Sequence, residues 1–386
     1  MKIGIVGGAL QGMESVFLSS KAGFETFVID RKEHAPALSL SDTYEVLDVV
    51  KEPDKAKKLL SDCDAVIPAC EEIDALTVLN KIMKGSGIPF LFDMDSYMIS
   101  SSKERSNMIM EELNIPLPGP WPECGFPVIV KPSSQSGSIG VSAVSNEEEM
   151  GDALRKVNEI GDTPIIQEFV SGKSVSIEVI GNGGSARSFY TTEVILDSNY
   201  DCKMVLCEPD ILPKEDDCLF SEIGKRIAES IGLNGLIDVE AIYTKKGLRV
   251  LEIDARIPSQ TPAAVWAATG VNLLEEFAFT AMGKVTGKNS RNECSAYEHY
   301  LVENGNMITC GEKNFGKVSE PRFEDRFFGA DEAITDYSPD KDVWRATVIT
   351  TGRNASEVLG KRKRFINNVM SECGLDGYVD GSPRMI

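Results

Sequence analysis

Short apolar runs alternate with helical patterns over the first 95 residues of the chain. The apolar, β-rich runs lie at 2–6, 25–30, 44–49 and 65–69, and a helical pattern extends from a glycine-rich loop at 7–12 to about residue 22. Strands that alternate with helices predict a parallel sheet covered by helices. Ligands bind such sheets beyond the carboxyl ends of the strands, so the loops at 7–12, 30–31 and 69–72 form the expected binding edge.

The pattern changes at a proline-rich stretch, residues 115–122, which predicts a linker into a new domain. The sequence beyond it predicts strands at 126–132, 164–170 and 175–180 and helices at 147–160 and 219–231. After residue 290 the pattern is weaker, with strands expected at 296–302 and 344–350 and a closing helix at 355–373. A chain of 386 residues is long enough for two or three domains, each with its own core.

Four carboxylates gather in two short β-rich runs around residue 245. A turn that ends in Gly247 separates the runs, which is typical of a β-hairpin. If Lys246 is the centre of a three-residue loop, Glu240 lies opposite Glu252 and Asp238 lies opposite Asp254. Side chains alternate along a strand, so all four acids then share one face of the hairpin.

Like charges directly opposite one another are destabilising, so this face is expected to meet a cation. Carboxylate oxygens suit Mg²⁺, above all together with nucleotide phosphates. A solvated hairpin, balanced by Arg256 and nearby lysines, is the alternative interpretation of the same residues.

Composition and charge narrow the class of protein. The chain is 42% hydrophobic and 26% charged, as is usual for a globular protein, and its net charge of −20 argues against nucleic-acid or anionic-membrane partners. The nine cysteines show no C-x-x-C pair, which indicates reduced thiols in the cytoplasm. With only two histidines, a His-rich metal site is not expected. We expect no secretory leader, and the sequence has no apolar run long enough to span a membrane.

The glycine loop at 7–12 and Asp30 suggest one further interpretation, a dinucleotide site of an NAD-dependent amino-acid dehydrogenase. The loop reads GGALQG, however, and its spacing departs from the G-x-G-x-x-G pattern. A glycine turn is also needed wherever a strand and a helix pack closely. This interpretation leaves the acidic hairpin unexplained.

Lys131 ends a predicted strand and precedes a Ser/Gly loop at 133–141. A cation followed by several backbone N–H groups suits phosphate oxygens, although the loop is not a Walker A sequence. A flexible surface loop is the alternative. Lys103 is a second candidate phosphate ligand, and the segment at 167–174 could form a hinge beside an adenine.

Taken in order, these segments resemble the ATP-grasp superfamily of carboxylate–amine ligases, most specifically at Glu240 and at 252–256. The resemblance implies an α/β chain with α+β character in its later part. It also implies a Rossmann-like domain at 1–95, an ATP-grasp domain at 96–290 with a lid subdomain at about 115–175, and a C-terminal domain at 291–386. Such enzymes are ATP- and Mg²⁺-dependent, form an amide through an acyl phosphate, and release ADP and phosphate.

The resemblance also assigns roles to residues. Arg256 and Lys131 would be catalytic, and two Mg²⁺ ions would be bound by Glu240, Glu252 and Asp254. The residues implied for ATP binding are Lys103, Lys131, Ser136, Gly137, Ser138, Glu168, Val170 and Ser174. Asp254 replaces a usual Asn, Ser174 replaces a frequent ribose-binding Glu, and Asp238 is an extra acid with no assigned role.

Within the superfamily the chain is most similar to the ligases of pyrrolysine biosynthesis, on the evidence of residues 1–32 and 248–270. That similarity implies that the substrates are 3-methyl-D-ornithine and L-lysine. A different amino-acid or purine-pathway ligase of the superfamily is the nearer alternative. The family also suggests a homodimer, although the sequence shows no interface signature. Candidate substrate-binding residues are Gln11, Glu71, Glu72, Asn234, Gly235 and Glu303.

Overall fold

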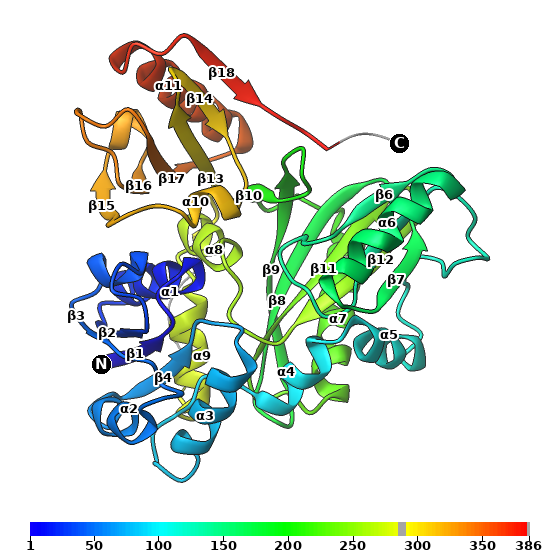
Figure 1. Ribbon diagram of the computed structural model, residues 1–386, viewed down its shortest axis with the longest axis horizontal. Helices are drawn as coiled ribbons and strands as arrows, with labels where there is room; N and C mark the ends of the chain where they lie inside the picture. Colours follow the sequence, from blue (N-terminus) through cyan, green and yellow to red (C-terminus); the bar gives the residue numbers. More distant parts are fainter. Residues whose placement is uncertain (285–290, 384–386) are drawn as a thin grey trace.

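A computed structural model describes residues 1–284 and 291–383. Figure 1 shows an N-terminal sheet and a C-terminal group of strands on one side of the molecule, with the central strands and the lid on the other. Helices α8 and α9 lie between these parts. Within the described residues no helix is both long and apolar enough to cross a membrane.

The N-terminal sheet has the predicted parallel arrangement, with strand order β3-β2-β1-β4. Its strands and helices are β1 (Lys2–Val6), α1 (Leu10–Lys21), β2 (Glu25–Asp30), β3 (Thr43–Val46), α2 (Pro53–Leu60), β4 (Ala65–Pro68) and α3 (Ile73–Met83). Helix α1 begins inside the expected glycine loop. A Cβ on Gly12 would lie 2.2 Å from the Gly7 carbonyl oxygen, so this glycine lets the helix pack against the end of β1.

A small antiparallel sheet of order β6-β5-β7 carries the lid. The segment that leads to it and covers it contains α4 (Met94–Ser100), α5 (Lys103–Glu112), β5 (Val128–Pro132), β6 (Ser142–Val144), α6 (Glu147–Ile160) and β7 (Pro164–Glu168). Helix α6 buries Met150, Ala153 and Val157 against β5 and β6. Lys131 therefore stands on a strand that is packed from one side.

The large sheet joins the central and C-terminal parts of the chain. Its central elements are β8 (Lys173–Gly181), β9 (Ala186–Leu196), β10 (Cys202–Cys207), α7 (Lys214–Ser230), β11 (Leu236–Thr244), β12 (Gly247–Asp254), α8 (Thr261–Thr269) and α9 (Leu273–Ala281). The later elements are β13 (Cys294–Glu303), β14 (Asn306–Thr309), α10 (Glu312–Phe315), β15 (Arg322–Asp325), β16 (Glu332–Thr335), β17 (Trp344–Gly352), α11 (Ala355–Glu372) and β18 (Gly377–Asp380). The expected domain boundary at residue 290 thus crosses one continuous sheet, because β10 pairs with β13.

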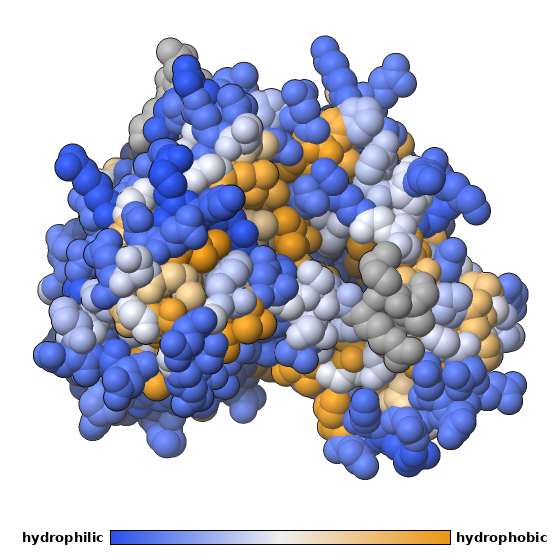
Figure 2. Space-filling view, turned by 90° about the horizontal axis from the view of Figure 1, so that it is seen from above, coloured by the Kyte–Doolittle hydropathy of each residue, from blue (hydrophilic) through white to orange (hydrophobic). Residues whose placement is uncertain are grey.

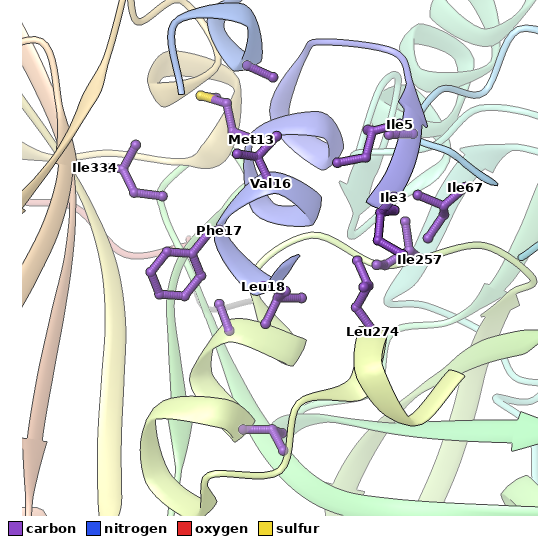
Figure 3. Close-up of a cluster of buried hydrophobic side chains, with 14 of the residues drawn as sticks. Ile3, Ile5, Met13, Val16, Phe17, Leu18, Ile67, Ile257, Leu274 and Ile334 are labelled. Carbon is purple, nitrogen blue, oxygen red and sulfur yellow. The ribbon is translucent and has the colours of Figure 1, made fainter. Parts of the chain in front are cut away.

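One hydrophobic cluster ties the three parts together. Ile3 from β1, Phe17 from α1, Leu274 from α9 and Ile334 from β16 all belong to it (Figure 3). The ring of Phe17 meets Trp266 edge-on at 5.4 Å between centroids, and it also contacts Phe323. The N-terminal sheet is therefore packed firmly against α8, α9 and the C-terminal strands.

Candidate active site

The acidic hairpin has the predicted pairing where it matters. Asp238 pairs with Asp254, and Glu240 pairs with Glu252. The predicted three-residue loop is wrong, however, because Thr244 pairs with Gly247 and only two residues lie between them. A bulge at Leu251, between the pairs Glu240–Glu252 and Ala241–Val250, shifts the register by one residue and brings the acids back opposite one another.

The neighbouring strand β8 adds a fifth acid, because Glu178 pairs with Asp238 across the sheet. Both side chains are buried, with exposed fractions of 0% and 5%. Burial raises the pKa of Glu178 to about 7, and burial together with Glu240 and Asp254 raises the pKa of Asp238 well above its usual value. Asp238 is therefore the most buried of the four hairpin acids, and Glu240, Glu252 and Asp254 are more open to the cavity.

The remaining acids divide into one that is neutralised by lysines and two that are not. Lys103 Nζ lies 2.9 Å from Glu252, and Lys103 and Lys131 hold the pKa of Glu252 below its usual value although burial opposes them. Burial and the charges of Glu252 and Asp254 raise the pKa of Glu240 to about 8. Burial raises the pKa of Asp254 to about 6, although Arg256 opposes the shift.

This unbalanced negative charge fits a divalent cation. In the described residues no three His, Cys, Asp or Glu side chains gather closely enough to enclose an ion by themselves. Mg²⁺ bound with nucleotide phosphates needs only one or two protein carboxylates, because phosphate and water oxygens complete its shell. The hairpin therefore fits a phosphate-bridged ion and not a closed protein cage.

Arg256 follows the hairpin directly and lies beside two acids. Its Nε is 2.7 Å from Glu71 Oε1, and one terminal nitrogen is 3.3 Å from Asp254. The neighbouring carboxylates raise the pKa of the guanidinium although burial opposes them. Arg256 is thus a permanent, largely buried cation at the end of the acidic strand.

A cavity of about 540 Å³ extends from the hairpin to the lid sheet. Of the predicted ATP-binding residues, its lining includes Lys103, Lys131, Gly137, Ser138, Glu168, Val170 and Ser174. Burial lowers the pKa of Lys131, whose Nζ donates to the Leu251 carbonyl over 3.3 Å. The hinge is fixed by Glu168, because its carboxylate accepts the Gly119 N–H at 3.0 Å.

The lid loop bridges three parts of the molecule. Ser136 Oγ donates to Glu71 Oε2 at 2.6 Å, and Ser138 Oγ donates to the Tyr200 carbonyl at 2.6 Å. Lys103 Nζ also donates to the Gln135 carbonyl at 2.7 Å. The loop is therefore held over the cavity by the N-terminal domain on one side and by the β9–β10 hairpin on the other.

A second cavity, of about 690 Å³, lies beyond the carboxyl ends of the N-terminal strands. Gln11, Glu71 and Glu72 line it as predicted, together with Ser136 of the lid. Figure 2 shows a largely hydrophilic face whose hydrophobic residues gather toward the middle, between two lobes. The two cavities share the residues Gly137, Arg256, Ser259 and Glu312, so they meet at Arg256.

The acids of this second cavity are mostly engaged. Glu71 accepts from Gln11 at 2.9 Å as well as from Ser136 and Arg256, and Glu72 forms a two-pronged pair with Arg31. Asp30 accepts the N–H groups of Gly8 and Lys32 at 2.6 and 2.7 Å. Asp30 therefore holds the glycine loop in place. This structural role accounts for an acid at this position without a bound dinucleotide.

Three predicted substrate residues lie elsewhere. The Asn234 N–H donates to Asp93 at 2.9 Å, and Gly235 packs against the same aspartate. Glu303 pairs with Asn306 at the end of the β13–β14 hairpin. None of the three lines either cavity in the described part of the chain, so the geometry gives these assignments no support.

Comparison with known proteins shows which family the chain resembles in sequence. Residues 100–260 match the family model described as the ATP-grasp domain. The chain is 36% identical to the 3-methyl-D-ornithine–L-lysine ligase of Methanosarcina acetivorans over 326 residues, which cover 82% of this chain and 86% of that protein. It is 35% identical to the ligase of the same name from Methanosarcina mazei, with 80% of each chain covered. The chain belongs to the ATP-grasp ligase family.

Solved structures show the same ATP-grasp fold. The chain is similar to the biotin carboxylase domain of the Hydrogenobacter thermophilus 2-oxoglutarate carboxylase, with a TM-score of 0.72, 15% identity, and coverage of 95% of this chain and 89% of that one. It is also similar to N5-carboxyaminoimidazole ribonucleotide synthetase from Thermotoga maritima, with a TM-score of 0.66, 21% identity, and coverage of 95% and 98%. ATP-grasp enzymes use ATP and Mg²⁺, and the first of these structures contains MgADP.

Several residues of this ATP-grasp ligase's cavities escaped prediction. Ser259 and Glu312 line both cavities, and Gln260 lies beside them in the first. Glu193 also lines the first cavity, where it forms an ion pair with Lys173 at 2.9 Å. Glu312 follows a glycine in a short loop after β14, with no motif around it. Only the pairing of distant strands brings it to the cavity, so no local sequence pattern indicates its place.

Proposed function

We propose that this ATP-dependent ligase joins the carboxylate of 3-methyl-D-ornithine to the ε-amine of L-lysine, a step of pyrrolysine biosynthesis. The observation that carries the proposal is the meeting of two cavities at Arg256. One cavity carries lysines and acids suited to a triphosphate, and the other is lined by polar groups suited to an amino acid. The printed names of the Methanosarcina relatives supply the substrate pair.

The nucleotide would occupy the cavity beneath the lid. We assign its phosphates to Lys103, Lys131 and the lid residues Ser136, Gly137 and Ser138, and its base and sugar to Glu168, Val170 and Ser174. Glu240, Glu252 and Asp254 would hold two Mg²⁺ ions, because Mg²⁺ bound together with a nucleotide needs only one or two protein carboxylates. When bound, the metal neutralises the charge of the phosphates and aligns them with the acceptor carboxylate.

The chain's own residues then serve two steps. Lys103 and Lys131 hold the γ-phosphoryl group in line with the substrate carboxylate, which attacks it, displaces ADP and forms the acyl phosphate. Arg256 lies where the two cavities meet, and its cation stabilises the oxyanion that develops as the amide bond forms. Contacts of this kind are worth about 3–4 kcal/mol where a donor has been removed. The lid excludes water, which would otherwise hydrolyse the acyl phosphate.

The amino-acid substrates would approach through the N-terminal cavity. Gln11, Glu71 and Glu72 stand on its wall, and the hydrogen bonds of Glu71 make it a group that orients Arg256 and Ser136. We therefore propose Gln11 and Glu71 as positioning residues for the substrate end of the site. Glu72 lies further out, because its side chain is 53% exposed.

The test is an incubation of the protein with Mg-ATP and both amino acids, each also supplied alone. The proposal predicts ADP, phosphate and an amide of the summed mass only when both acids are present. If an amide formed only from another pair, such as two D-alanines, the substrate assignment would be wrong and the ligase assignment would stand. Reduction of NAD would support the dehydrogenase instead.

We also propose that the ligase is a cytoplasmic homodimer. None of the nine cysteines, all of which lie in the described residues, forms a disulfide. The 2-oxoglutarate carboxylase domain with the same fold is a dimer. Light scattering on the purified protein gives its mass in solution, and a mass near 42.1 kDa would mean a monomer.

A further inference from the structure

Glu312 occupies the passage between the two cavities. It begins the short helix α10 and is one of the four residues that line both cavities. Among those four, Arg256 is the cation and Glu312 is the anion. A substrate group that crosses from the N-terminal cavity toward the nucleotide therefore passes both charges.

The orientation of the Glu312 side chain is fixed through one of its oxygens. Ser259 Oγ and Gln260 Nε2 each donate to Glu312 Oε2 at 2.8 Å. Gln260 is in turn held in a left-handed backbone conformation, with φ of 75°, and its N–H donates to buried Glu14 on α1. Tyr297 on β13 donates its hydroxyl to the same glutamate at 2.5 Å. Buried groups from α1 and β13 thus fix the place of this one carboxylate.

The other oxygen, Oε1, faces the lid. A Cβ built on Gly137 would lie 3.7 Å from it, so Oε1 lies under the loop that covers the reacting groups. Within the described residues no hydrogen-bond donor reaches Oε1. The other acids of the N-terminal cavity are occupied, since Glu71 has three donors and Glu72 is paired with Arg31. The shared wall therefore offers one carboxylate oxygen to a substrate.

We propose that Glu312 Oε1 holds the attacking amino group of the amine substrate and receives its proton as the amide forms. This inference rests on the proposed ligase function. The nitrogen lone pair forms the bond to the acyl carbon, the carbon–oxygen bond to phosphate breaks, and phosphate leaves with that electron pair. On becoming an amide N–H the ammonium loses two protons: one passes to Oε1 and frees the lone pair for attack, and the departing phosphate takes the other. An alkyl ammonium with a pKa of about 10.4 is protonated at neutral pH, so an acceptor at this place is chemically required.

The charges around Glu312 are compatible with this role. Arg256 and Lys313 supply positive charge, while Asp201 and Glu14 supply carboxylates on the protein side. In this assignment Arg256 stabilises the oxyanion and Glu312 binds the amine, and both residues line both cavities.

The test separates acyl-phosphate formation from amine attack. Hydroxylamine, which is uncharged at neutral pH, traps an acyl phosphate as a hydroxamate without needing a base. For Glu312→Gln we expect hydroxamate formation from 3-methyl-D-ornithine and Mg-ATP at the native rate, while amide formation with L-lysine falls by about 10²–10⁴-fold. The amide rate of the variant should also rise with pH, as more lysine loses its proton. Glu324→Gln is the matched control, because Glu324 lies on β15 and lines neither cavity in the described residues.

Equal retention of both reactions, or equal loss of both in a folded variant, would overturn the assignment. Glu312→Asp keeps the charge but has a shorter side chain. It should therefore lose part of the amide formation and retain hydroxamate formation at the native rate. If neither variant melts like the native protein, Glu312 has a structural role and the proposal fails. Absence of hydroxamate from the native protein would instead overturn the proposed ligase function.

Discussion

Glu252 is the hairpin acid that lies between two lysines and an arginine, and its pKa is held low by them. We expect Glu252→Gln to abolish ligation, because the neutral amide removes a metal ligand and leaves Lys103 without its partner. The fold should persist, since the residue stands on a cavity wall and not in the core. ADP release measured with both amino acids checks this.

Glu229→Gln serves as the control, because it makes the same change on an exposed turn at the end of α7. If Glu252→Gln released ADP at the native rate, the assignment of the hairpin to metal and phosphate would be wrong.

His299 provides a pH-dependent prediction. It is fully buried, its Nδ1 is 2.6 Å from Thr347 Oγ1, and its ring stacks on Phe315. Burial lowers its pKa from 6.5 to about 3, so the unfolded chain takes up a proton before the folded chain does. Stability contributed by neutral His299 is present above about pH 6.5 and is lost as the pH falls toward 3.

Between pH 7.5 and 5.5 this group alone should lower the free energy of unfolding by about 1.4 kcal/mol. Urea unfolding of the native protein and of His299→Phe at both pH values measures the effect. The variant should lose less stability on acidification by that amount. An identical pH dependence of the two proteins would contradict the buried, neutral state of His299.

Individual site residues could be predicted where a local sequence pattern marks them. The alternation of Asp238, Glu240, Glu252 and Asp254 indicated their common face, and Lys131 was found from its place at the end of a strand before a Ser/Gly loop. Glu312 and Gln260 could not be predicted, since their positions depend on long-range contacts with α1 and β13.

Among the elements, the lid allows the sharpest prediction. Ser136→Ala removes the hydrogen bond to Glu71 that ties the loop to the N-terminal domain. We expect the looser lid to admit water to the acyl phosphate, so ADP should form faster than amide, whereas the native protein forms the two in equal amounts. Parallel assays of ADP and amide measure that ratio. An unchanged ratio would mean that the Ser136 contact does not retain the intermediate.

The strands β9 and β10 show why some elements were missed. Side chains on both faces of β9 are partly exposed, so no clear alternation of buried and exposed positions marks it in the sequence. The hairpin loop was mispredicted for a different reason. A β-bulge at Leu251 changes the register by one residue, and bulges leave no pattern of hydrophobic positions.

The whole molecule depends on the shared core. Phe17 on α1 contacts Trp266 on α8 and Phe323 on β15, and the residue is only 2% exposed. We expect Phe17→Ala to cost about 3–5 kcal/mol and to lower the melting temperature of the N-terminal and C-terminal parts together. Calorimetry that showed only one part melting earlier would argue for independent domains.

The fold could be predicted in outline but not in its long-range strand pairing. The β/α alternation of the first 95 residues identified the parallel sheet, because all four of its strands come from that one stretch of the chain. The pairing of β10 with β13 joins segments about ninety residues apart, which no local pattern shows. Likewise, the site exists only where that sheet, the lid and the N-terminal loops come together.

The central claim is that ATP activates a substrate carboxylate as an acyl phosphate, and one isotope experiment tests it directly. The carboxylate of 3-methyl-D-ornithine is labelled with heavy oxygen and incubated with the enzyme, Mg-ATP and L-lysine. One labelled oxygen should then appear in the phosphate released, because the carboxylate attacks the γ-phosphate and gives up that oxygen when the amine displaces it. Mass spectrometry of the phosphate would contradict the account if amide forms while the phosphate carries no label.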